Sequence, residues 1–351
     1  MTTLAELTTL RVGGPAARYE EAATEAEFVD AIRGADDEGI PLLVIGGGSN
    51  LLVTDAGFDG LVLRDARQDV RIQDDGFCGG VSVTATAGAS WDALVEQAVA
   101  SEWIGLEALS GIPGSVGAAP VQNIGAYGAE LADTLASVRV WDRERAAVRT
   151  LALMELGFGY RTSILKRSVE APYGPTPRYV VLDVTVHTRF GTRSAPVRYQ
   201  QLADALGISQ GDTASIADVR EAVLALRSSK GMVLDADDHD TWSAGSFFTN
   251  PVVPQGQVPE GAPQYSASGS EGDVKTSAAW LIEKAGIHKG FALPGSRAAI
   301  SSKHTLALTN RGDASAQEVL ELATHVQVTV ARAWGIALVP EPVIVADNQG
   351  P

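Results

Sequence analysis

Cysteine is almost absent from this 351-residue chain, which contains only Cys78. A single cysteine excludes both an intramolecular disulfide and a metal site made of several cysteines. The sequence also lacks any apolar run long enough to cross a membrane. Its first ten residues, MTTLAELTTL, lack the basic region and the following apolar region of a signal peptide. We therefore expect a cytoplasmic protein that does not insert into a membrane and holds no metal ion.

Positive charge is scarce as well. The chain has 27 Lys and Arg residues against 43 Asp and Glu residues, which gives a net charge of −16. This excess of negative charge argues against non-specific binding to nucleic acid or to a membrane surface, and an anionic ligand would need Lys and Arg placed close to it. The hydrophobic content of 45% supports real cores, and the length allows two or three domains. We expect a monomer whose partner is a small molecule.

Glycine, in contrast, is concentrated at two places, and the first organises the chain. The stretch VIGGGSNLLV (44–53) sets three successive glycines between two apolar, strand-like segments. Such a loop can direct its N–H groups at an anion, although an ordinary turn between strands is the simpler explanation. It is not a GxGxxG fingerprint, because no helical pattern follows it, and it lacks the GK[ST] ending of a P-loop. The loop residues are Gly46, Gly47, Gly48, Ser49 and Asn50.

The second glycine-rich stretch, GLEALSGIPGSVGAAPVQNIGAYGAEL, covers residues 105–131. Most of its residues are small, and a loop of small residues could fold on itself. That alternative explains some of the glycines, but not the amides of Gln122 and Asn123 in so apolar a neighbourhood. A flat ligand that packs against the backbone, with polar groups at its edge, would explain both.

Helical and alternating patterns succeed one another along the chain. A capping box at Thr24 predicts a helix that ends at Gly39, and Ser90 begins another helix. The segment 254–273, rich in Pro, Gly and Ser, is expected to be a loop without clear structure. The segment 335–345 contains Pro340 and Pro342, so its strand must lie at an edge or end. We also expect helices over 215–226, 277–285 and 316–330, and strands over 41–45, 61–63, 70–72, 81–85, 179–188 and 306–308.

Four stretches together resemble one enzyme family. GGGSN (46–50) and GIPGSVGAAPVQNIGAYG (111–128) are similar to the FAD-binding segments of UDP-N-acetylenolpyruvoylglucosamine reductases. LGFGYRTSILK (156–166) and AGSFFTNP (244–251) resemble two further motifs of that family, in the same order. The resemblance implies an α+β protein. Two α/β subdomains would form an FAD-binding fold of the vanillyl-alcohol oxidase type, and a third, α+β domain would cover the substrate.

The resemblance also implies the reaction and the cofactor contacts. Enzymes of this family use NADPH and bound FAD to reduce an enolpyruvyl UDP-sugar to UDP-N-acetylmuramate for peptidoglycan synthesis. NADPH would be a co-substrate, and FAD would contact both glycine-rich stretches. In addition to the first loop, the matched positions are Gly111, Ile112, Pro113, Gly114, Ser115, Gly117, Ala118, Gln122, Asn123, Gly125, Ala126 and Tyr127.

Three matched residues are implied to be catalytic. Hydride addition leaves an enolate-like intermediate, which needs charged or hydrogen-bonding groups at its carboxylate and an acid at its carbon. Arg161 offers a planar fork suited to a carboxylate. Ser246, followed by Phe247 and Phe248 in a dry environment, would donate the proton. Glu341 can donate to the enolate only in its protonated form, which burial favours.

Further residues are assigned to the nucleotide substrate. Tyr199 lies in a stretch that resembles the extra loop of the type I members, whose tyrosine closes over the substrate. Lys230 and Asn250 are candidates for the diphosphate, and Lys275 and Arg297 are additional candidates for it. His304 lies where a polar contact is expected.

We predict four segments from these matches. FAD-binding subdomain 1 would cover residues 1–66, and FAD-binding subdomain 2 would cover residues 67–226. A substrate-binding domain would cover residues 227–335, and a C-terminal segment, 336–351, would return to the active site.

Each assignment has an ordinary structural alternative. Arg161 alone is more often a surface residue, Ser246 a strand-end hydroxyl bonded to backbone, and Glu341 a solvated carboxylate. Two other functions also stay open: another FAD-dependent oxidoreductase of the same fold, such as an oxidase, and a flavin-binding protein without catalysis. Oxidases of this fold often attach FAD through a histidine, and neither glycine-rich stretch contains one. A non-catalytic protein would not need the three catalytic candidates together.

Overall fold

The computed structural model describes residues 2–74, 80–169, 173–266 and 272–346, so Cys78 lies outside the described residues. The chain divides into two compact units. Unit 1 takes the described residues of Met1–Ala16, Gly48–Phe58 and Leu234–Pro351, and unit 2 takes those of Ala17–Gly47 and Asp59–Val233. The predicted division into four segments stays a prediction.

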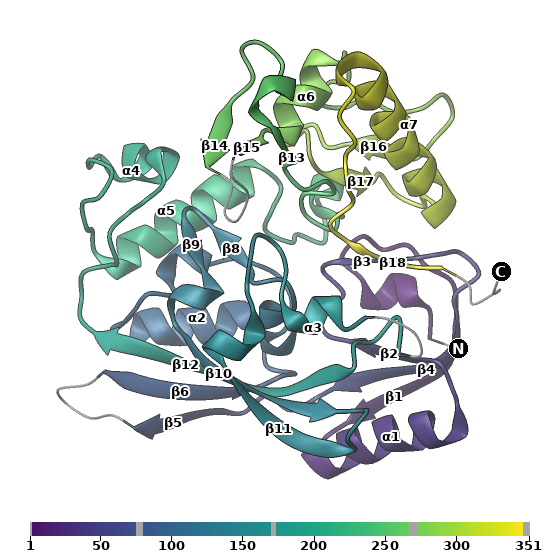
Figure 1. Cartoon of the computed structure of the whole chain (residues 1–351), viewed down its shortest axis with the longest axis vertical. Helices are drawn as coiled ribbons and strands as arrows, with labels where there is room; N and C mark the ends of the chain where they lie inside the picture. The colour runs from purple at the N-terminus through teal and green to yellow at the C-terminus, as the bar shows by residue number, and fades with distance from the viewer. Residues whose placement is uncertain (1, 75–79, 170–172, 267–271, 347–351) are drawn as a thin grey trace. The chain divides into compact units, whose positions relative to one another are not determined.

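A small α/β layer opens unit 2. The strands β1 (Ala16–Ala22), β4 (Phe58–Asp65) and β2 (Leu42–Ile45) form a sheet in that order, and α1 (Glu25–Glu38) lies beside it (Figure 1). Phe28 and Ile32 of α1 share a buried cluster with Leu42. The predicted capping box is confirmed, because the Thr24 hydroxyl accepts the N–H of Glu27. Gly39 ends the helix in the left-handed conformation, as predicted.

The larger layer of unit 2 is an antiparallel sheet with the strand order β11-β10-β12-β6-β5, and β7 pairs with the end of β12. The helix α2 (Trp91–Ala100) packs on this sheet, since Trp91 and Leu94 share its core with Val83 (Figure 1). As predicted, α2 begins at Ser90, whose hydroxyl caps it. The strand bounds are β5 (Val70–Asp74), β6 (Val81–Thr86), β7 (Trp103–Ile104), β10 (Leu135–Asp142), β11 (Ala147–Ala152) and β12 (Tyr179–Phe190).

Ion pairs join the two layers of unit 2. Arg67, which follows β4, donates to Asp65 at 2.7 Å and to Glu25 of α1 at 3.2 Å. Arg139 of β10 donates to Glu25 at 2.6 Å and also pairs with Asp183 of β12. Each charge in this network has a partner of opposite sign, which is the condition under which charged groups tolerate burial.

The rest of unit 2 consists of short elements and two helices. A hairpin of β8 (Gly125–Ala126) and β9 (Ala129–Glu130) carries Tyr127 at its tip. After β12, α4 (Gln200–Leu206) and α5 (Ile216–Ser229) pack on each other through Leu202 and Val219. The remaining elements are η2 (Glu107–Leu109), η3 (Val116–Val121), η4 (Leu131–Asp133), η5 (Leu153–Leu156) and α3 (Ile164–Arg167).

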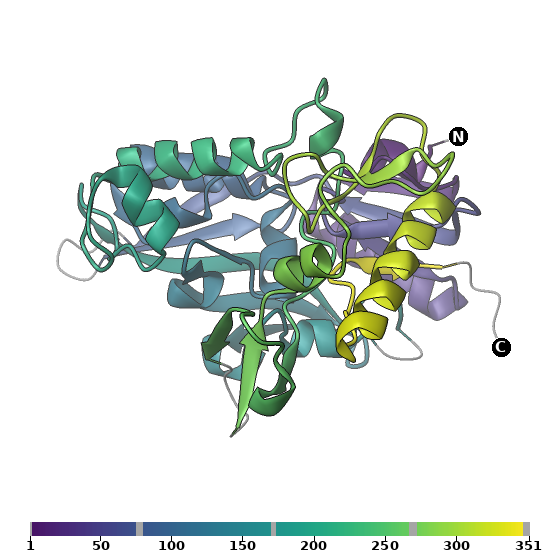
Figure 2. The ribbon, with the colours of Figure 1, turned by 90° about the horizontal axis from the view of Figure 1, so that it is seen from above.

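Unit 1 is built around one long helix, α7 (Ala316–Trp334), the yellow helix of Figure 2. Its apolar face shares a core with α6 (Ala278–Lys284) and with the hairpin of β16 (Ala298–Ile300) and β17 (Leu308–Asn310). Near the C-terminal end of the chain, β18 (Val343–Val345) pairs in parallel with β3 (Leu51–Val53). The strand β3 directly follows the first glycine loop. Two short 3-10 helices, η1 (Leu4–Leu7) and η6 (His239–Thr241), complete the unit's regular elements outside the segment 252–276. Among the described residues, no helix is both long and apolar enough to cross a membrane.

The prediction of a loop over 254–273 is wrong. The strands β13 (Val252–Pro254), β15 (Asp273–Thr276) and β14 (Gln264–Ser266) form a sheet in that order, and η7 (Gln255–Gln257) follows β13. These strands have only three or four residues each, so pairing between them, rather than local composition, decides their conformation. The strand expected over 306–308 lies at Leu308–Asn310, and only Val343–Val345 of the segment 335–345 is a strand.

The turn between β6 and α2 gives a test of the packing. A Cβ on Gly88 would lie 2.2 Å from the Asp65 carbonyl oxygen and 2.6 Å from that of Arg67. We predict that Gly88→Ala destabilises the protein by about 1–3 kcal/mol, because the backbone must move to make room. Gly34→Ala in α1 is the control, since no atom lies within 4 Å of the added methyl, and alanine favours a helix by about 0.5–1 kcal/mol. Thermal unfolding measures both, and an unchanged melting temperature for Gly88→Ala would contradict the packing described.

Candidate active site

Backbones of the two glycine-rich loops lie against each other in unit 2. A Cβ on Gly46 would lie 2.2 Å from the Ser115 Oγ, and a Cβ on Gly47 would lie 2.7 Å from the Cα of Gly114. Real Cβ atoms do not approach other atoms so closely, and only glycine allows this contact. The two loops therefore meet backbone to backbone at Gly47 and Gly114, and the Ser115 side chain lies against Gly46.

The three glycines of the first loop have N–H groups that no described residue accepts. Those of Gly46, Gly47 and Gly48 donate no hydrogen bond to any described residue. Gly48 is buried and has a φ of 61°. Buried N–H groups require an acceptor, and successive N–H groups in such a turn suit the oxygens of a phosphate. This part of the loop fits an anionic ligand such as the diphosphate of a dinucleotide.

A carboxylate that the sequence analysis did not single out holds the start of the second loop. Asp92, in the first turn of α2, accepts the N–H of Gly111 at 2.6 Å and two hydrogen bonds from Arg220 of α5, at 2.7 and 3.0 Å. Burial raises the pKa of Asp92, but the hydrogen bonds from Arg220 and Gly111 outweigh it, so the pKa lies below its ordinary value. No local pattern could have revealed this residue, because Arg220 lies 128 positions away.

The two amides of the second loop are engaged within the chain. The buried Asn123 donates to Glu130 at 2.8 Å and accepts the N–H of Ala132 at 3.1 Å. The Gln122 Oε1 accepts from Lys166 at 3.3 Å. The amide of Asn123 is thus explained by the fold, and a flavin contact of this residue, which stays a prediction, would come from its backbone.

Arg161 lies beside the second loop in unit 2. It has a φ of 53°, which is uncommon for a residue with a side chain and concentrates at functional sites. Its Nη2 donates to the carbonyl of Gly125 at 3.1 Å. The Ser163 hydroxyl donates to the carbonyl of Val121 at 2.5 Å and caps α3, which ties the turn to the same loop. Arg161 is therefore not the solvated surface arginine of the simpler explanation.

A second arginine, Arg227, lies in the last turn of α5, three residues before Lys230, and no local sequence pattern distinguishes it as buried. Its Nη2 donates to the carbonyl of Met232 at 2.8 Å, while its Nε is buried and forms no hydrogen bond with the residues that the structure describes. Burial lowers the pKa of Arg227, and the charge of Arg161 acts in the same direction. A buried cation that no described carboxylate pairs with favours an anionic ligand nearby.

Tyr199 and Lys230 meet at Tyr127, the tip of the β8–β9 hairpin. The Tyr199 and Tyr127 rings stand edge to face with centroids 5.7 Å apart. The Lys230 Nζ lies 5.6 Å from the centroid of the Tyr127 ring and donates to Gln201 of α4 at 2.6 Å. Unit 2 thus brings two predicted substrate residues together with one predicted flavin residue.

In unit 1 the backbone brings the segments around Ser246 and Glu341 together. The N–H of Glu341 donates to the carbonyl of Phe247 at 2.8 Å, and the N–H of Phe247 donates to Leu306 at 2.7 Å. Phe248 and Pro340 form an additional bridge. The extended backbone expected before Pro342 therefore pairs with the segment that follows Ser246.

Ser246 itself has little structural role. Its hydroxyl forms no hydrogen bond with any residue that the structure describes, so it is not the backbone-bonded hydroxyl of the simpler explanation. The following Phe247 and Phe248 are fully buried, at 0% and 1% exposure. Asn50, from the first glycine loop, donates to the carbonyl of Glu341 at 3.4 Å. Unit 1 thus joins three residues that the sequence analysis had selected separately.

The other substrate candidates are placed in unit 1. Asn250 accepts the N–H of Ala278 at 2.9 Å at the start of α6. His304 lies two residues before Leu306, and its N–H donates to the Ser301 hydroxyl at 3.2 Å. Lys275 lies in β15, and the exposed Arg297 pairs with Asp313 at 2.9 Å. Their roles stay predictions. In the part of the chain that the structure describes, no cluster of His, Cys, Asp or Glu suits a metal ion.

Two family models match the chain. Residues 16–151 match the FAD binding domain, and residues 237–345 match the C-terminal domain of UDP-N-acetylenolpyruvoylglucosamine reductase. The first match includes both glycine-rich loops, and the second includes Ser246 and Glu341. The motifs selected from the sequence thus fall within the matched domains, except the Arg161 turn and the stretch from Tyr199 to Lys230, which lie between them.

Full-length relatives and a solved structure agree. The UDP-N-acetylenolpyruvoylglucosamine reductase of Cutibacterium acnes is 52% identical to this chain, and that of Saccharopolyspora erythraea is 50% identical. Each match covers 97% of this chain, and the matches cover 88% and 94% of the two relatives. The crystal structure of the reductase from Thermus caldophilus matches with a TM-score of 0.66 and 28% identity, over 98% of this chain and 97% of the other. These matches confirm the predicted α+β class and FAD-binding fold.

The Asp92 contacts predict a pH-dependent loss of stability. Since its folded-state pKa lies below the ordinary value of about 3.9, Asp92 stabilises the fold above that pH, and this contribution disappears as the pH falls through the folded-state value. We predict that Asp92→Asn costs roughly 1–3 kcal/mol at pH 7 and that the difference from wild type shrinks below about pH 4.

Melting temperatures of both proteins between pH 7 and pH 3 measure this difference. Asp30→Asn is the control, because Asp30 forms an exposed ion pair with Arg33 and should change stability by less than about 1 kcal/mol at any pH. A gap between Asp92→Asn and wild type that stays constant with pH would show that the charge of Asp92 does not contribute.

Proposed function

The chain belongs to the UDP-N-acetylenolpyruvoylglucosamine reductase family, and from this premise we propose how its residues carry the reaction. The enzyme reduces UDP-N-acetylglucosamine enolpyruvate to UDP-N-acetylmuramate, with NADPH as reductant and FAD as cofactor, in peptidoglycan precursor synthesis. Membership of this family favours the reductase over an oxidase of the same fold and over a non-catalytic flavin-binding protein.

The residues of the two glycine-rich loops fit FAD. Gly46 and Gly47 lie against Gly114 and Ser115 with no room for a side chain, and the first loop has N–H groups without acceptors in the described chain. We propose that these N–H groups hold the FAD diphosphate, while the second loop, from Gly111 to Tyr127, lines the flavin. When bound, FAD transfers hydride from NADPH to the enolpyruvyl group.

Arg161 is proposed to bind the carboxylate of the enolpyruvyl group. Negative charge develops next to this carboxylate when hydride adds to the terminal carbon, and a fixed guanidinium stabilises that charge more than the ground state. The turn that holds Arg161 is anchored to the second loop through Gly125 and Ser163. Arg227, a buried cation near Arg161, is proposed to add to the positive potential in unit 2.

Ser246 is proposed to protonate the carbon next to the carboxylate. Its hydroxyl is committed to no described partner, and its chain neighbour Phe247 is held on both sides by hydrogen bonds to Leu306 and Glu341. A hydroxyl is a weak acid, but it can protonate a strongly basic carbanion in a site that excludes water. This uncommitted hydroxyl next to the fully buried Phe247 and Phe248 is the single observation that carries the assignment.

The remaining assignments are part of the same proposal. Glu341 would assist at the enolate, and Tyr199, Lys230, Asn250 and His304 would contact the UDP-sugar, with Tyr199 closing over it. Lys275 and Arg297 are weaker candidates, and Arg297 already has Asp313 as a partner. We also propose that the enzyme works as a monomer in the cytoplasm and without nucleic acid, in agreement with its net charge of −16. The four segments, with boundaries after residues 66, 226 and 335, remain the proposed functional division.

Substitution of Ser246 tests the proton donor. We predict that Ser246→Ala leaves flavin reduction by NADPH near its normal rate, because that step needs no proton at the substrate carbon. Reoxidation by the enolpyruvyl UDP-sugar should slow about a hundred- to ten-thousand-fold, the usual cost of removing a general acid. Stopped-flow absorbance of the flavin follows both steps, as bleaching and then recovery. Ser246→Cys should restore part of the rate, since a thiol can also donate a proton.

Ser243→Ala is the matched control, because the Ser243 hydroxyl accepts the N–H of Gly245 at 3.2 Å and therefore has a structural role in the same segment. It should lower stability without slowing recovery selectively. If Ser246→Ala recovers at the wild-type rate, Ser246 is not the donor. If bleaching slows as much as recovery, the role of Ser246 is structural.

A further inference from the structure

A short turn near the start of unit 1, residues 8–11, touches both the first glycine loop and the segment 242–247 that contains Ser246. We call it the N-terminal turn. The Arg11 N–H closes it by donating to the Thr8 carbonyl at 3.3 Å. Thr8 and Thr9 are buried, at 6% and 7% exposure, so their hydroxyls need acceptors inside the fold. None of its residues is among the proposed catalytic or binding residues.

One side of the N-terminal turn holds the first glycine loop. The Thr9 N–H donates to the Gly48 carbonyl at 3.2 Å. A Cβ on Gly48 would lie 2.0 Å from the Leu7 carbonyl oxygen and 2.7 Å from the Thr8 Cα, so the loop packs directly on the backbone of this region. These contacts use backbone atoms and do not depend on the Thr9 side chain.

The Thr9 side chain is bonded to the segment of Ser246. Its hydroxyl donates to the Ser243 carbonyl at 2.7 Å, across 234 positions of sequence. Between Ser243 and Ser246 the chain passes through Gly245, which has a φ of 73° and where an added Cβ would meet no atom within 4 Å. Since glycine restricts the backbone little, the position of Ser246 depends on the anchors on either side of it. Phe247 is the anchor after Ser246, through the hydrogen bonds described above.

Asn310 of β17 holds the N-terminal turn in place without the Thr9 hydroxyl. Its side-chain amide donates to the carbonyls of Leu10 and Arg11, at 3.3 and 3.0 Å, and its backbone N–H donates to that of Trp242 at 3.0 Å. The Arg11 guanidinium also lies 3.9 Å from the centroid of the Trp242 ring. The turn should therefore stay in place when the Thr9 hydroxyl is removed.

We propose that the Thr9 hydroxyl positions the proton donor. Through the Ser243 carbonyl it sets where the Ser246 hydroxyl lies relative to the FAD that the first glycine loop holds. The inference rests on the proposed function, in which Ser246 is the donor and the loop binds FAD. A general acid must lie within hydrogen-bond reach of the atom that it protonates, and a displacement of about 1 Å can cost about a hundredfold in rate.

Thr9→Val tests this role, because valine keeps the branched shape and the backbone N–H but lacks the hydroxyl. In stopped-flow experiments on the FAD-bound enzyme, flavin bleaching by NADPH should stay within about twofold of the wild-type rate. Recovery with the enolpyruvyl UDP-sugar should slow about ten- to a hundredfold. Thr9→Ser keeps the hydroxyl and should recover at nearly the wild-type rate. Thr9→Ala lacks it without placing a methyl group at the Ser243 carbonyl, and should slow recovery as Thr9→Val does.

Thr8→Val is the matched control. The Thr8 hydroxyl is equally buried in the same turn, but it donates to the Val12 carbonyl at 3.3 Å rather than to the segment of Ser246. Thr8→Val should therefore bleach and recover like the wild type. Ser243→Ala retains the carbonyl that Thr9 binds, so it should not imitate Thr9→Val.

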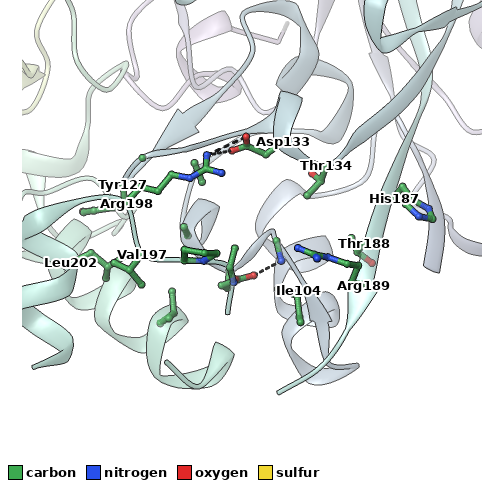
Figure 3. Close-up of a pocket in the computed structure, with 18 residues that line it drawn as sticks. Ile104, Tyr127, Asp133, Thr134, His187, Thr188, Arg189, Val197, Arg198 and Leu202 are labelled. Atoms are coloured by element: carbon green, nitrogen blue, oxygen red, sulfur yellow. Dashed lines mark hydrogen bonds and ion pairs between the residues drawn. The ribbon is translucent and has the colours of Figure 1, made fainter. Parts of the chain in front are cut away.

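The affinity for the UDP-sugar separates positioning from substrate binding. The supports of the predicted lid residue Tyr199 lie in unit 2, where the preceding Arg198 pairs with Asp133 at 3.3 Å (Figure 3) and the Tyr199 ring contacts Tyr127. Thr9 belongs to unit 1. Thr9→Val should therefore lower the maximal rate of recovery, while the UDP-sugar concentration that half-saturates this rate changes by less than about twofold.

A double variant decides whether Thr9 acts through Ser246. Once Ser246 is alanine, no hydroxyl is left to position, so adding Thr9→Val should slow recovery no further. The inference is overturned if Thr9→Val recovers at the wild-type rate, loses its flavin, slows bleaching as much as recovery, or adds its full effect to that of Ser246→Ala. Equal slowing of recovery in Thr8→Val would overturn it as well. A wild-type recovery rate in Ser246→Ala would instead refute the proposed proton donor, and the role of Thr9 would fall with it.

Discussion

The contact between two glycine backbones, Gly47 and Gly114, is the constraint on which the flavin-binding architecture depends. It requires that Gly47, in the loop after β2, and Gly114, in the second glycine-rich loop, approach each other with no side chain on either residue. The surrounding fold serves to hold the two loops there. The first loop leaves the small parallel sheet, and the second is fixed by Asp92, which is fixed in turn by Arg220 of α5. The ion-pair network around Arg67 and Glu25 then locks the two layers of unit 2 together.

The residues proposed to bind and protonate the substrate lie far apart in the sequence. Unit 2 carries the cations, with Arg161 beside the second loop and Lys230 beside Tyr127. Unit 1 carries the proposed acid, since its backbone pairs the segment of Ser246 with that of Glu341, 95 positions later. The two proposed tasks would therefore have different scaffolds: positive charge in unit 2 for the substrate's carboxylate and phosphates, and the hydrogen-bonded segments of unit 1 for the proton donor.

Local sequence patterns predicted those elements whose conformation depends on interactions between residues close in sequence. The caps at Thr24 and Ser90, the strand β12 and the glycine loops follow from signals within a few residues, and all are found in the structure. The failures share a cause. The sheet over 252–276, the pairing of Asp92 with Arg220, and the burial of Arg227 depend on partners distant in sequence. The side chain of Asn123, selected from the sequence as a ligand contact, is bonded to Glu130 of the β8–β9 hairpin, and its flavin contact stays a prediction.

Flavin content of a Gly47→Ala variant tests the central claim most directly. The added Cβ would lie 2.7 Å from the Gly114 Cα, so the loops must separate, although each layer keeps its own core. The account predicts that purified wild-type enzyme and Gly34→Ala each bind one FAD per chain, judged by flavin absorbance against protein concentration. Gly47→Ala should keep its circular dichroism spectrum and lose most of its flavin. A Gly47→Ala variant that binds FAD as tightly as the wild type would contradict the claim that this backbone contact builds the cofactor site.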